Sequence, residues 1–256
     1  MKSRILVAAH KPYDFPQNAL YTPIHVGKVT TSSEFGISGD DSGENISDKN
    51  PSFCELTALY WAWKNGFFKD IDYCGLVHYR RYFKGSLPFL KTAILSEKEI
   101  AEHMDTYDII LPRKRNYYIE SIRSHYAHAH YEKDLDMTRK IMEEQCPEFL
   151  DTFDTFMSQR RLHLYNMFIM PVAEFESYIA WLFEILFELE KRTDTSNYDD
   201  YQKRIYGFVA ERLLNVWVLH RQYHVKTLSV AQIEGSGTIG KIIPFLKRKL
   251  SGGAKR

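Results

Sequence analysis

Two short apolar segments, each followed at once by polar and cationic residues, constrain the fold of this chain most strongly. Residues 4–9 (RILVAA) lead into His10 and Lys11, and residues 73–77 (YCGLV) lead into the sequence HYRRYF. Runs of this length and composition indicate β-strands that are buried on both faces of a sheet. Because ligands of α/β proteins bind beyond the carboxyl ends of such strands, the residues that follow both segments are candidate site residues.

Helical patterns surround these strands. Residues 52–64 follow Pro51, show the Ser52-to-Glu55 spacing of a capping box and stop at Gly66, so we expect one helix there. We also expect helices at residues 132–144, 148–159, 173–191 and 206–220, and strands at residues 107–111 and 165–170. Strands and helices in this order predict an α/β fold with a parallel or mixed central sheet and a helical C-terminal half.

Length and charge limit the class of protein. The chain has 256 residues, 44% hydrophobic and 26% charged, which favours one globular domain at residues 1–233. A net charge of +1 provides no basic field for a nucleic-acid partner. The apolar run near the N-terminus is too short for a signal peptide and no stretch has the length of a membrane span, so we expect a cytoplasmic protein.

The last residues have a different composition. Residues 234–256 contain a Gly-Ser segment and then a basic stretch, and residues 239–256 hold six Lys or Arg and no acid. A basic amphipathic segment of this kind binds anionic bilayers, which would make the protein peripheral on the inner face of the membrane. A disordered terminus is the alternative, because Pro244 interrupts any helix there.

The sequence HYRRYF is the strongest candidate site. Arg80 and Arg81 follow His78 and Tyr79, and adjacent guanidinium groups match the oxygens of a diphosphate. The alternative is structural, with one arginine in a surface ion pair and the following Tyr82 in the core.

A histidine-rich run gives a second candidate site. His125, His128 and His130 precede Asp134, and imidazole and carboxylate groups bind metals such as zinc, although no recognised ligand spacing is met. Hydrogen bonds from His130 and Asp134 to a sugar or acceptor, or ordinary surface histidines, are the other interpretations.

Glu211 lies within an otherwise apolar helical pattern. It is either paired with Arg204 or Arg212, or has a raised pKa suited to proton transfer. Asn50 and Glu55 stand at a helix entrance, and for them we favour capping alone.

Five motifs in order resemble a bacterial family of capsular or exopolysaccharide biosynthesis glycosyltransferases, long described as a domain of unknown function. They are HKP at residues 10–12, DDSGENIS at 40–47, NPSFCELTALYWAWKN at 50–65, HYRRYF at 78–83 and NMFIM at 166–170. The resemblance covers roughly residues 4–229. It implies a GT-A-like nucleotide-sugar-binding fold and hexose transfer from a UDP-sugar, with galactofuranose or galactose favoured, to a saccharide or lipid-linked saccharide acceptor.

The resemblance also assigns roles. His10, Lys11, His78 and Tyr79 are expected to bind the donor together with Arg80 and Arg81. Asp40 and Asp41 are expected to contact uridine, ribose or sugar hydroxyls, with metal binding as a minor alternative. Asn166, His130 and Asp134 are assigned to the sugar or acceptor, and Glu211 is the candidate base or sugar-orienting residue.

One departure from the GT-A pattern concerns metal binding. Such enzymes commonly place an Asp-x-Asp after the strand that here leads into HYRRYF, and this chain has no acidic pair there. Fixed cations stabilise a departing diphosphate as a metal does, so we expect Arg80 and Arg81 to substitute and no divalent metal or other cofactor to be required. A metal-dependent hydrolase using residues 125–134 and a non-catalytic carbohydrate-binding subunit are the alternatives.

Overall fold

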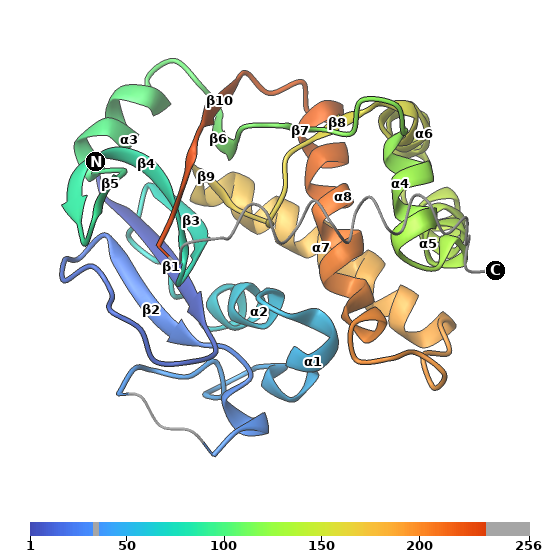
Figure 1. Cartoon of the computed structure of the whole chain (residues 1–256), viewed down its shortest axis with the longest axis horizontal. Coiled ribbons are helices and arrows are strands. Elements are labelled where there is room, and N and C mark those ends of the chain that lie inside the picture. The colour runs from blue at the N-terminus through green and yellow to red at the C-terminus, as the bar shows by residue number, and fades with distance from the viewer. Residues whose placement is uncertain (33–35, 234–256) are drawn as a thin grey trace.

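The computed structural model describes residues 1–32 and 36–233, which form a mixed α/β domain (Figure 1). The basic segment expected at residues 234–256 lies outside the described residues. The predicted α/β class, with a mixed central sheet and a helical C-terminal half, is confirmed. No helix in the described ranges is both long and apolar enough to cross a membrane.

The central sheet is mixed in direction. Its main path has the order β10-β6-β9-β3-β1-β2, in which β1 runs parallel to β2 and β3 while β9 is antiparallel to β3 and β6. These strands are β1 (Ser3–Ala9), β2 (Tyr21–His25), β3 (Tyr73–His78), β6 (Ile109–Pro112), β9 (Phe168–Pro171) and β10 (Val225–Leu228). The sheet is extended by β4 (Arg81–Phe89), β5 (Thr92–Ile94) and β11 (Val230–Gln232), which pair antiparallel.

Both faces of the sheet are buried, as the apolar runs predict. In β1, Leu6 and Ala8 belong to one hydrophobic cluster, whereas Ile5 and Val7 belong to the other. Gly75 of β3 leaves room for the neighbouring strand, because a Cβ there would lie 2.5 Å from the carbonyl oxygen of Phe168. The two central strands are therefore held firmly, and their carboxyl ends have fixed positions.

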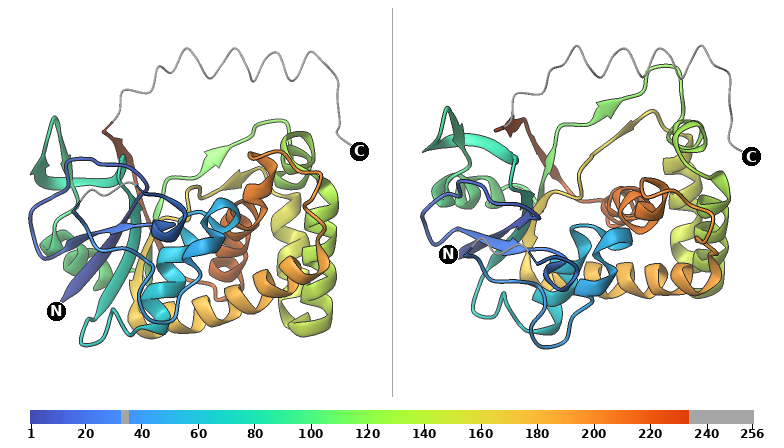
Figure 2. Two further views of the ribbon diagram at one scale, coloured as in Figure 1. Left: turned by 90° about the horizontal axis from the view of Figure 1, so that it is seen from below. Right: turned by 60° about the horizontal axis from the view of Figure 1, so that its bottom comes forward.

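Helices α4, α5, α6 and α8 make up the other half of the molecule, whereas α3 lies beside the sheet (Figure 1). Figures 1 and 2 show the sheet on one side, α4 to α6 on the far side, and α8 between them. The helices are α1 (Asn50–Phe53), α2 (Leu56–Lys64), α3 (Glu97–Met104), α4 (Ile122–Ala129), α5 (Glu132–Gln145), α6 (Leu150–Ser158), α7 (Val172–Arg192) and α8 (Ile205–His220). The four helices expected after residue 130 are confirmed, with bounds that shift by one or two residues.

The prediction of a single helix at residues 52–64 is wrong. Cys54 has φ 54° and ψ −133°, which breaks the segment into α1 and α2. The side-chain amide of Asn50 donates to the Cys54 carbonyl oxygen at 2.7 Å, and Ser52 bonds to Lys49 instead of forming a capping box with Glu55. Gly207 of α8 approaches this corner so closely that a Cβ there would lie 3.2 Å from Cys54 Sγ. Tertiary contacts thus override the local helical pattern.

The conformation of Cys54 generates a stability prediction. A non-glycine residue in this backbone region costs about 1–3 kcal/mol, while glycine adds about 0.5–1 kcal/mol of unfolded-chain entropy. We expect Cys54→Gly to be more stable than Cys54→Ala by about 1 kcal/mol, or roughly 2–4 °C in Tm. Both variants lose the thiol, so thermal unfolding of the pair isolates the backbone effect. Equal Tm values would show that the corner is unstrained.

Candidate functional site

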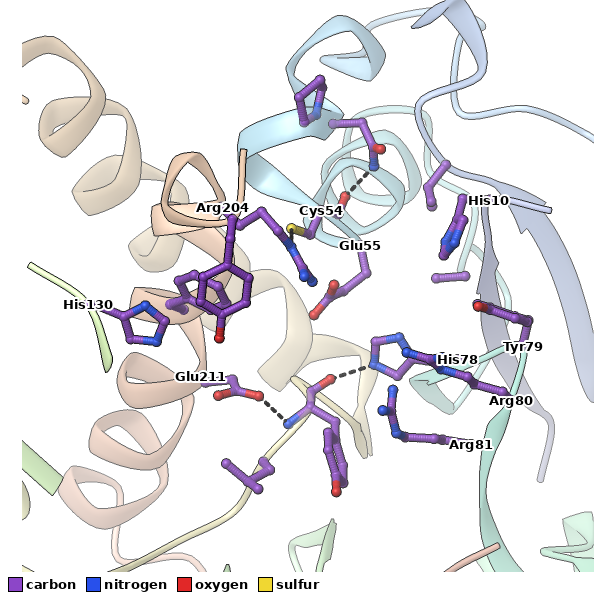
Figure 3. A pocket seen from close by; sticks show the side chains of 18 of the residues that line it. His10, Cys54, Glu55, His78, Tyr79, Arg80, Arg81, His130, Arg204 and Glu211 are labelled. Atoms are coloured by element: carbon purple, nitrogen blue, oxygen red, sulfur yellow. Dashed lines mark hydrogen bonds between the residues drawn. The ribbon is translucent and has the colours of Figure 1, made fainter. Parts of the chain in front are cut away.

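A cavity of about 870 Å³ opens at the carboxyl ends of β1 and β3 and faces α8 (Figure 3). Its walls come from segments far apart in the sequence. The side chains that line it and bear on the chemistry are His10, Lys11, Cys54, Glu55, His78, Tyr79, Arg80, Arg81, Tyr117, His125, His130, Tyr165, Tyr201, Arg204, Phe208, Glu211 and Arg212.

The charge of this cavity is strongly positive. Among residues 1–32 and 36–233, five Lys or Arg side chains line it against two carboxylates, Glu55 and Glu211. The cations are Lys11, Arg80, Arg81, Arg204 and Arg212. Because the whole chain carries a net charge of only +1, this local excess favours a ligand with more than one negative charge.

Tyr79 organises the cations at the sheet edge. It stands with Arg80 at the turn between β3 and β4, and its buried ring contacts the His10 ring edge-on with centroids 5.1 Å apart. The Lys11 ammonium lies 5.5 Å and the Arg80 guanidinium carbon 5.6 Å from the centre of the Tyr79 ring. One aromatic ring therefore holds cations from two strands together. Burial, followed by the neighbouring Lys11, lowers the pKa of His10, which favours the neutral imidazole.

Arg81 begins β4 and points toward the same cavity (Figure 3). Its guanidinium carbon lies 4.6 Å from the centre of the Tyr165 ring, and its buried Nε has no hydrogen-bond partner among the described residues. Burial, and then the charge of Arg80, lowers the pKa of Arg81. A buried donor without a partner, on a side chain that remains cationic at neutral pH, suits an anionic ligand.

A left-handed corner at Tyr165 and Asn166 connects the two sides of the cavity. Their φ angles are 78° and 52°, and the strand expected to begin at residue 165 starts only at Phe168. Glu211 accepts the Tyr165 N–H at 2.7 Å, and the Tyr165 carbonyl accepts from His78 Nε2 at 2.6 Å, as Figure 3 marks. The Asn166 amide donates to Glu55 at 2.8 Å. Positive φ angles at two successive non-glycine residues, the first of them a tyrosine, are costly and persist only where such contacts hold them.

The carboxylates of Glu55 and Glu211 differ in how many of their oxygens accept hydrogen bonds. Glu211 uses one oxygen for Tyr165 and has the other 3.1 Å from Arg212 Nη1, and burial raises its pKa although Arg212 opposes this. Glu55 accepts a hydrogen bond from Asn166 through one oxygen, and its other oxygen has no partner among the described residues. Glu55 is therefore the carboxylate with a free oxygen toward the cavity (Figure 3).

The structure brings most of the expected site residues together. His10, Lys11, His78, Tyr79, Arg80, Arg81, His130 and Glu211 all line the cavity. Asn166 is buried behind it and holds Glu55. Asp134 is buried elsewhere, where it accepts a hydrogen bond from the Tyr198 hydroxyl at 2.7 Å.

The acidic pair at residues 40 and 41 does not line the cavity. Asp40 is fully buried and accepts the backbone N–H groups of Gly27 and Lys28 at 3.0 and 3.2 Å. Asp41 lies on the exposed surface of the same loop. The Asp40 carboxylate therefore holds the loop around Gly27, and the expected contact of Asp40 and Asp41 with donor hydroxyls stays a prediction.

The three histidines of the 125–130 run do not converge. His125 stacks on Tyr117 with ring centroids 3.6 Å apart, and exposed His128 lies 3.1 Å from a Glu120 carboxylate oxygen. His130 is buried against Phe208. Residues 1–32 and 36–233 contain no group of three or more His, Cys, Asp or Glu side chains placed to hold a metal ion.

Sequence reasoning missed several cavity residues. Glu55 was assigned to capping, yet it makes no side-chain cap and faces the cavity. Arg204 was considered only as a partner for Glu211, but its Nε lies 3.2 Å from Cys54 Sγ in the cavity wall. A signal did exist for Arg204, since Lys203 and Arg204 stand at the N-terminal end of α8, where the helix dipole disfavours cations.

The chain belongs to the family described as "Domain of unknown function (DUF4422)", whose model matches residues 4–222. All the cavity residues named above fall within this match. No curated protein sequence matches the chain.

A solved structure has the same fold. The apo structure of the bifunctional glycosyltransferase WbbM is 32% identical in sequence and superposes with a TM-score of 0.83, covering 92% of this chain and 46% of that chain. This chain thus spans about half the length of the solved one, and its fold is that of part of a glycosyltransferase.

Asp134 generates a prediction about pH. Burial raises the pKa of Asp134 to about 6 from its ordinary value of 3.8, although the Tyr198 hydrogen bond opposes this. The folded state therefore holds this proton more tightly than the unfolded chain. The stability that this confers is complete below about pH 4 and is lost as the pH rises through about 6.

We expect the Tm of Asp134→Asn to rise relative to that of the wild type as the pH increases from 4 to 7, because the amide carries no charge to bury. Asp151→Asn provides the control, since it makes the same substitution at an exposed position. Thermal unfolding across this range measures both. A difference for Asp134→Asn that does not change with pH would contradict the assignment.

Proposed function

We propose that this chain is a glycosyltransferase that transfers a hexose, with galactofuranose or galactose favoured, from a UDP-sugar to a saccharide acceptor of a surface polysaccharide. The observation that carries the proposal is the cation-rich cavity at the carboxyl ends of β1 and β3, within a fold shared with part of a glycosyltransferase. That edge of an α/β sheet is where nucleotide ligands bind.

The donor diphosphate would lie against the cations of the sheet edge. Arg81 offers a buried donor that has no partner in the part of the chain that the structure describes, Arg80 stands on the adjacent turn, and Lys11 approaches from the end of β1. Positive charge that is fixed before the reaction stabilises the charge that develops on departing UDP. Arg204, on the opposite wall, adds a further cation that the sequence alone did not single out.

We infer that these cations take the place of a divalent metal. Asp40 is committed to its own loop, and no acidic pair follows β3. The cavity is instead lined by five Lys or Arg side chains. This arrangement supports a donor site whose charge is neutralised by the protein, in which no metal is required.

The acceptor step requires a base, and the geometry favours Glu55. The free oxygen of Glu55 would take the proton of the acceptor hydroxyl, while the hydroxyl oxygen forms a bond to the anomeric carbon of the donor sugar. The bond from that carbon to the diphosphate breaks, and its electron pair leaves with UDP. Glu211, which holds Tyr165, would act as an orienting residue, because both of its oxygens are engaged.

The first test concerns donor binding. Saturating UDP at about 100 times its Kd should add roughly 2.7 kcal/mol to the stability of the folded protein, and EDTA should not remove this gain. Arg81→Ala should abolish most of the shift and Arg81→Lys should restore little, since an ammonium lacks the planar fork. Arg139→Ala, which removes a partly exposed arginine of α5 that pairs with Asp154 and does not line the cavity, is the control.

Thermal shift with and without EDTA, together with UDP release from UDP-hexoses, measures these effects. A UDP shift that requires Mg²⁺ or Mn²⁺ would overturn the arginine model. UDP binding without UDP release in the presence of acceptor would favour the carbohydrate-binding alternative.

The second test separates the carboxylates. Glu55→Gln should lower transfer at least about 100-fold while the UDP thermal shift persists, because the amide keeps its shape but cannot accept the proton. Glu211→Gln retains an oxygen for the Tyr165 N–H and should lower transfer less. An equal or larger loss for Glu211→Gln would assign the base to Glu211.

A further inference from the structure

A small ribbon stands apart from the central sheet. Strands β7 (Arg115–Asn116) and β8 (Arg161–Leu162) pair antiparallel with each other and form a separate two-stranded sheet. They cross between the sheet half and the helical half (Figure 1). We call residues 113–119 and 159–162 the β7–β8 ribbon.

This ribbon is strongly basic. Five of its side chains are exposed cations, and none forms an ion pair with a carboxylate of the described residues. They are Arg113, Lys114, Arg115, Arg160 and Arg161. The ribbon contains no acidic residue, and the next one along the chain, Glu120, lies 3.1 Å from His128. In a chain of net charge +1, such a patch is a local electrostatic feature.

The tip of the ribbon exposes two apolar side chains. Tyr118 and Ile119 are 74% and 67% exposed, the highest values among the large hydrophobic residues of the described ranges. The tip is held in place, because the Tyr118 N–H donates to Asn116 Oδ1 at 2.9 Å and Arg160 donates to the Tyr118 carbonyl at 3.1 Å. Two neighbouring apolar side chains held out into solvent mark an interaction surface.

We propose that the β7–β8 ribbon docks the protein on an anionic lipid bilayer. The cations would lie at the headgroups while Tyr118 and Ile119 enter the interface, where aromatic side chains with a polar end are favoured. A soluble polyanion would satisfy the charges but leave the apolar tip in water. The five cations and the two tip residues of this surface do not line the cavity and precede residues 234–256 in the sequence.

Docking by this ribbon has a geometric consequence. Tyr117, which directly precedes the tip, lines the cavity and stacks on His125. The apolar tip and the cavity wall are thus adjacent residues. A bilayer in contact with Tyr118 would lie beside the cavity, within reach of a substrate that is anchored in lipid.

The test is co-sedimentation of the full chain with vesicles of phosphatidylcholine alone or with 30% phosphatidylglycerol. We expect binding to the anionic vesicles that weakens with added salt. Arg113→Gln/Arg115→Gln/Arg161→Gln should lower the partition coefficient by about 100-fold, from a contribution near 1 kcal/mol for each of the three cations. Tyr118→Ser/Ile119→Ser should also lower it, without changing the salt dependence.

The matched control removes three exposed lysines elsewhere. Lys69→Gln/Lys91→Gln/Lys98→Gln makes the same change in net charge away from the ribbon and should bind like the wild type. Both triple variants should retain the UDP thermal shift. Equal binding by the two triple variants would overturn the proposal, as would binding to heparin without binding to anionic vesicles.

Discussion

The left-handed corner at Tyr165 and Asn166 is the constraint on which the cavity depends. It joins β9 to both walls through polar contacts, with Glu211 of α8 on one side and His78 of β3 on the other. Asn166 extends the same network to Glu55. Because each contact fixes a group that also lines the cavity, the unfavourable backbone is offset by contacts that orient the site. The same hydrogen bonds therefore stabilise the fold and set the geometry of the site.

The cavity has cations on both of its walls. Its sheet edge concentrates Lys11 and Arg80 around the Tyr79 ring, and its helical wall contributes Arg204, Arg212 and the partly buried Glu211 carboxylate. A ligand with several negative charges therefore meets cations on either side. The buried Arg81 Nε donates no hydrogen bond within the described residues, so a ligand that supplies an acceptor there would offset the cost of burying it.

The sequence predicts the regular strands and helices of this fold because each has one local pattern of apolar residues. Strands β1 and β3 and the helices after residue 130 are recognisable from local runs, and the residues after both strands lie in the cavity as expected. The exceptions depend on distant residues. The break at Cys54 is imposed by Asn50 and by the approach of α8, and no local pattern records it. Likewise, N–H groups of the Gly27 turn hold the Asp40 carboxylate in the interior of its loop. The break between α1 and α2 leaves the Glu55 side chain facing the cavity.

The walls of the cavity come from several short segments, which lie as far apart in the sequence as His10 and Arg212. Such a site exists only once the chain has completed its long-range contacts, and no fragment of the chain assembles it. Whatever occupies the cavity therefore binds the finished fold alone and draws the folding equilibrium toward it. In a cell, the supply of that ligand would influence how long each copy of the protein escapes proteolysis.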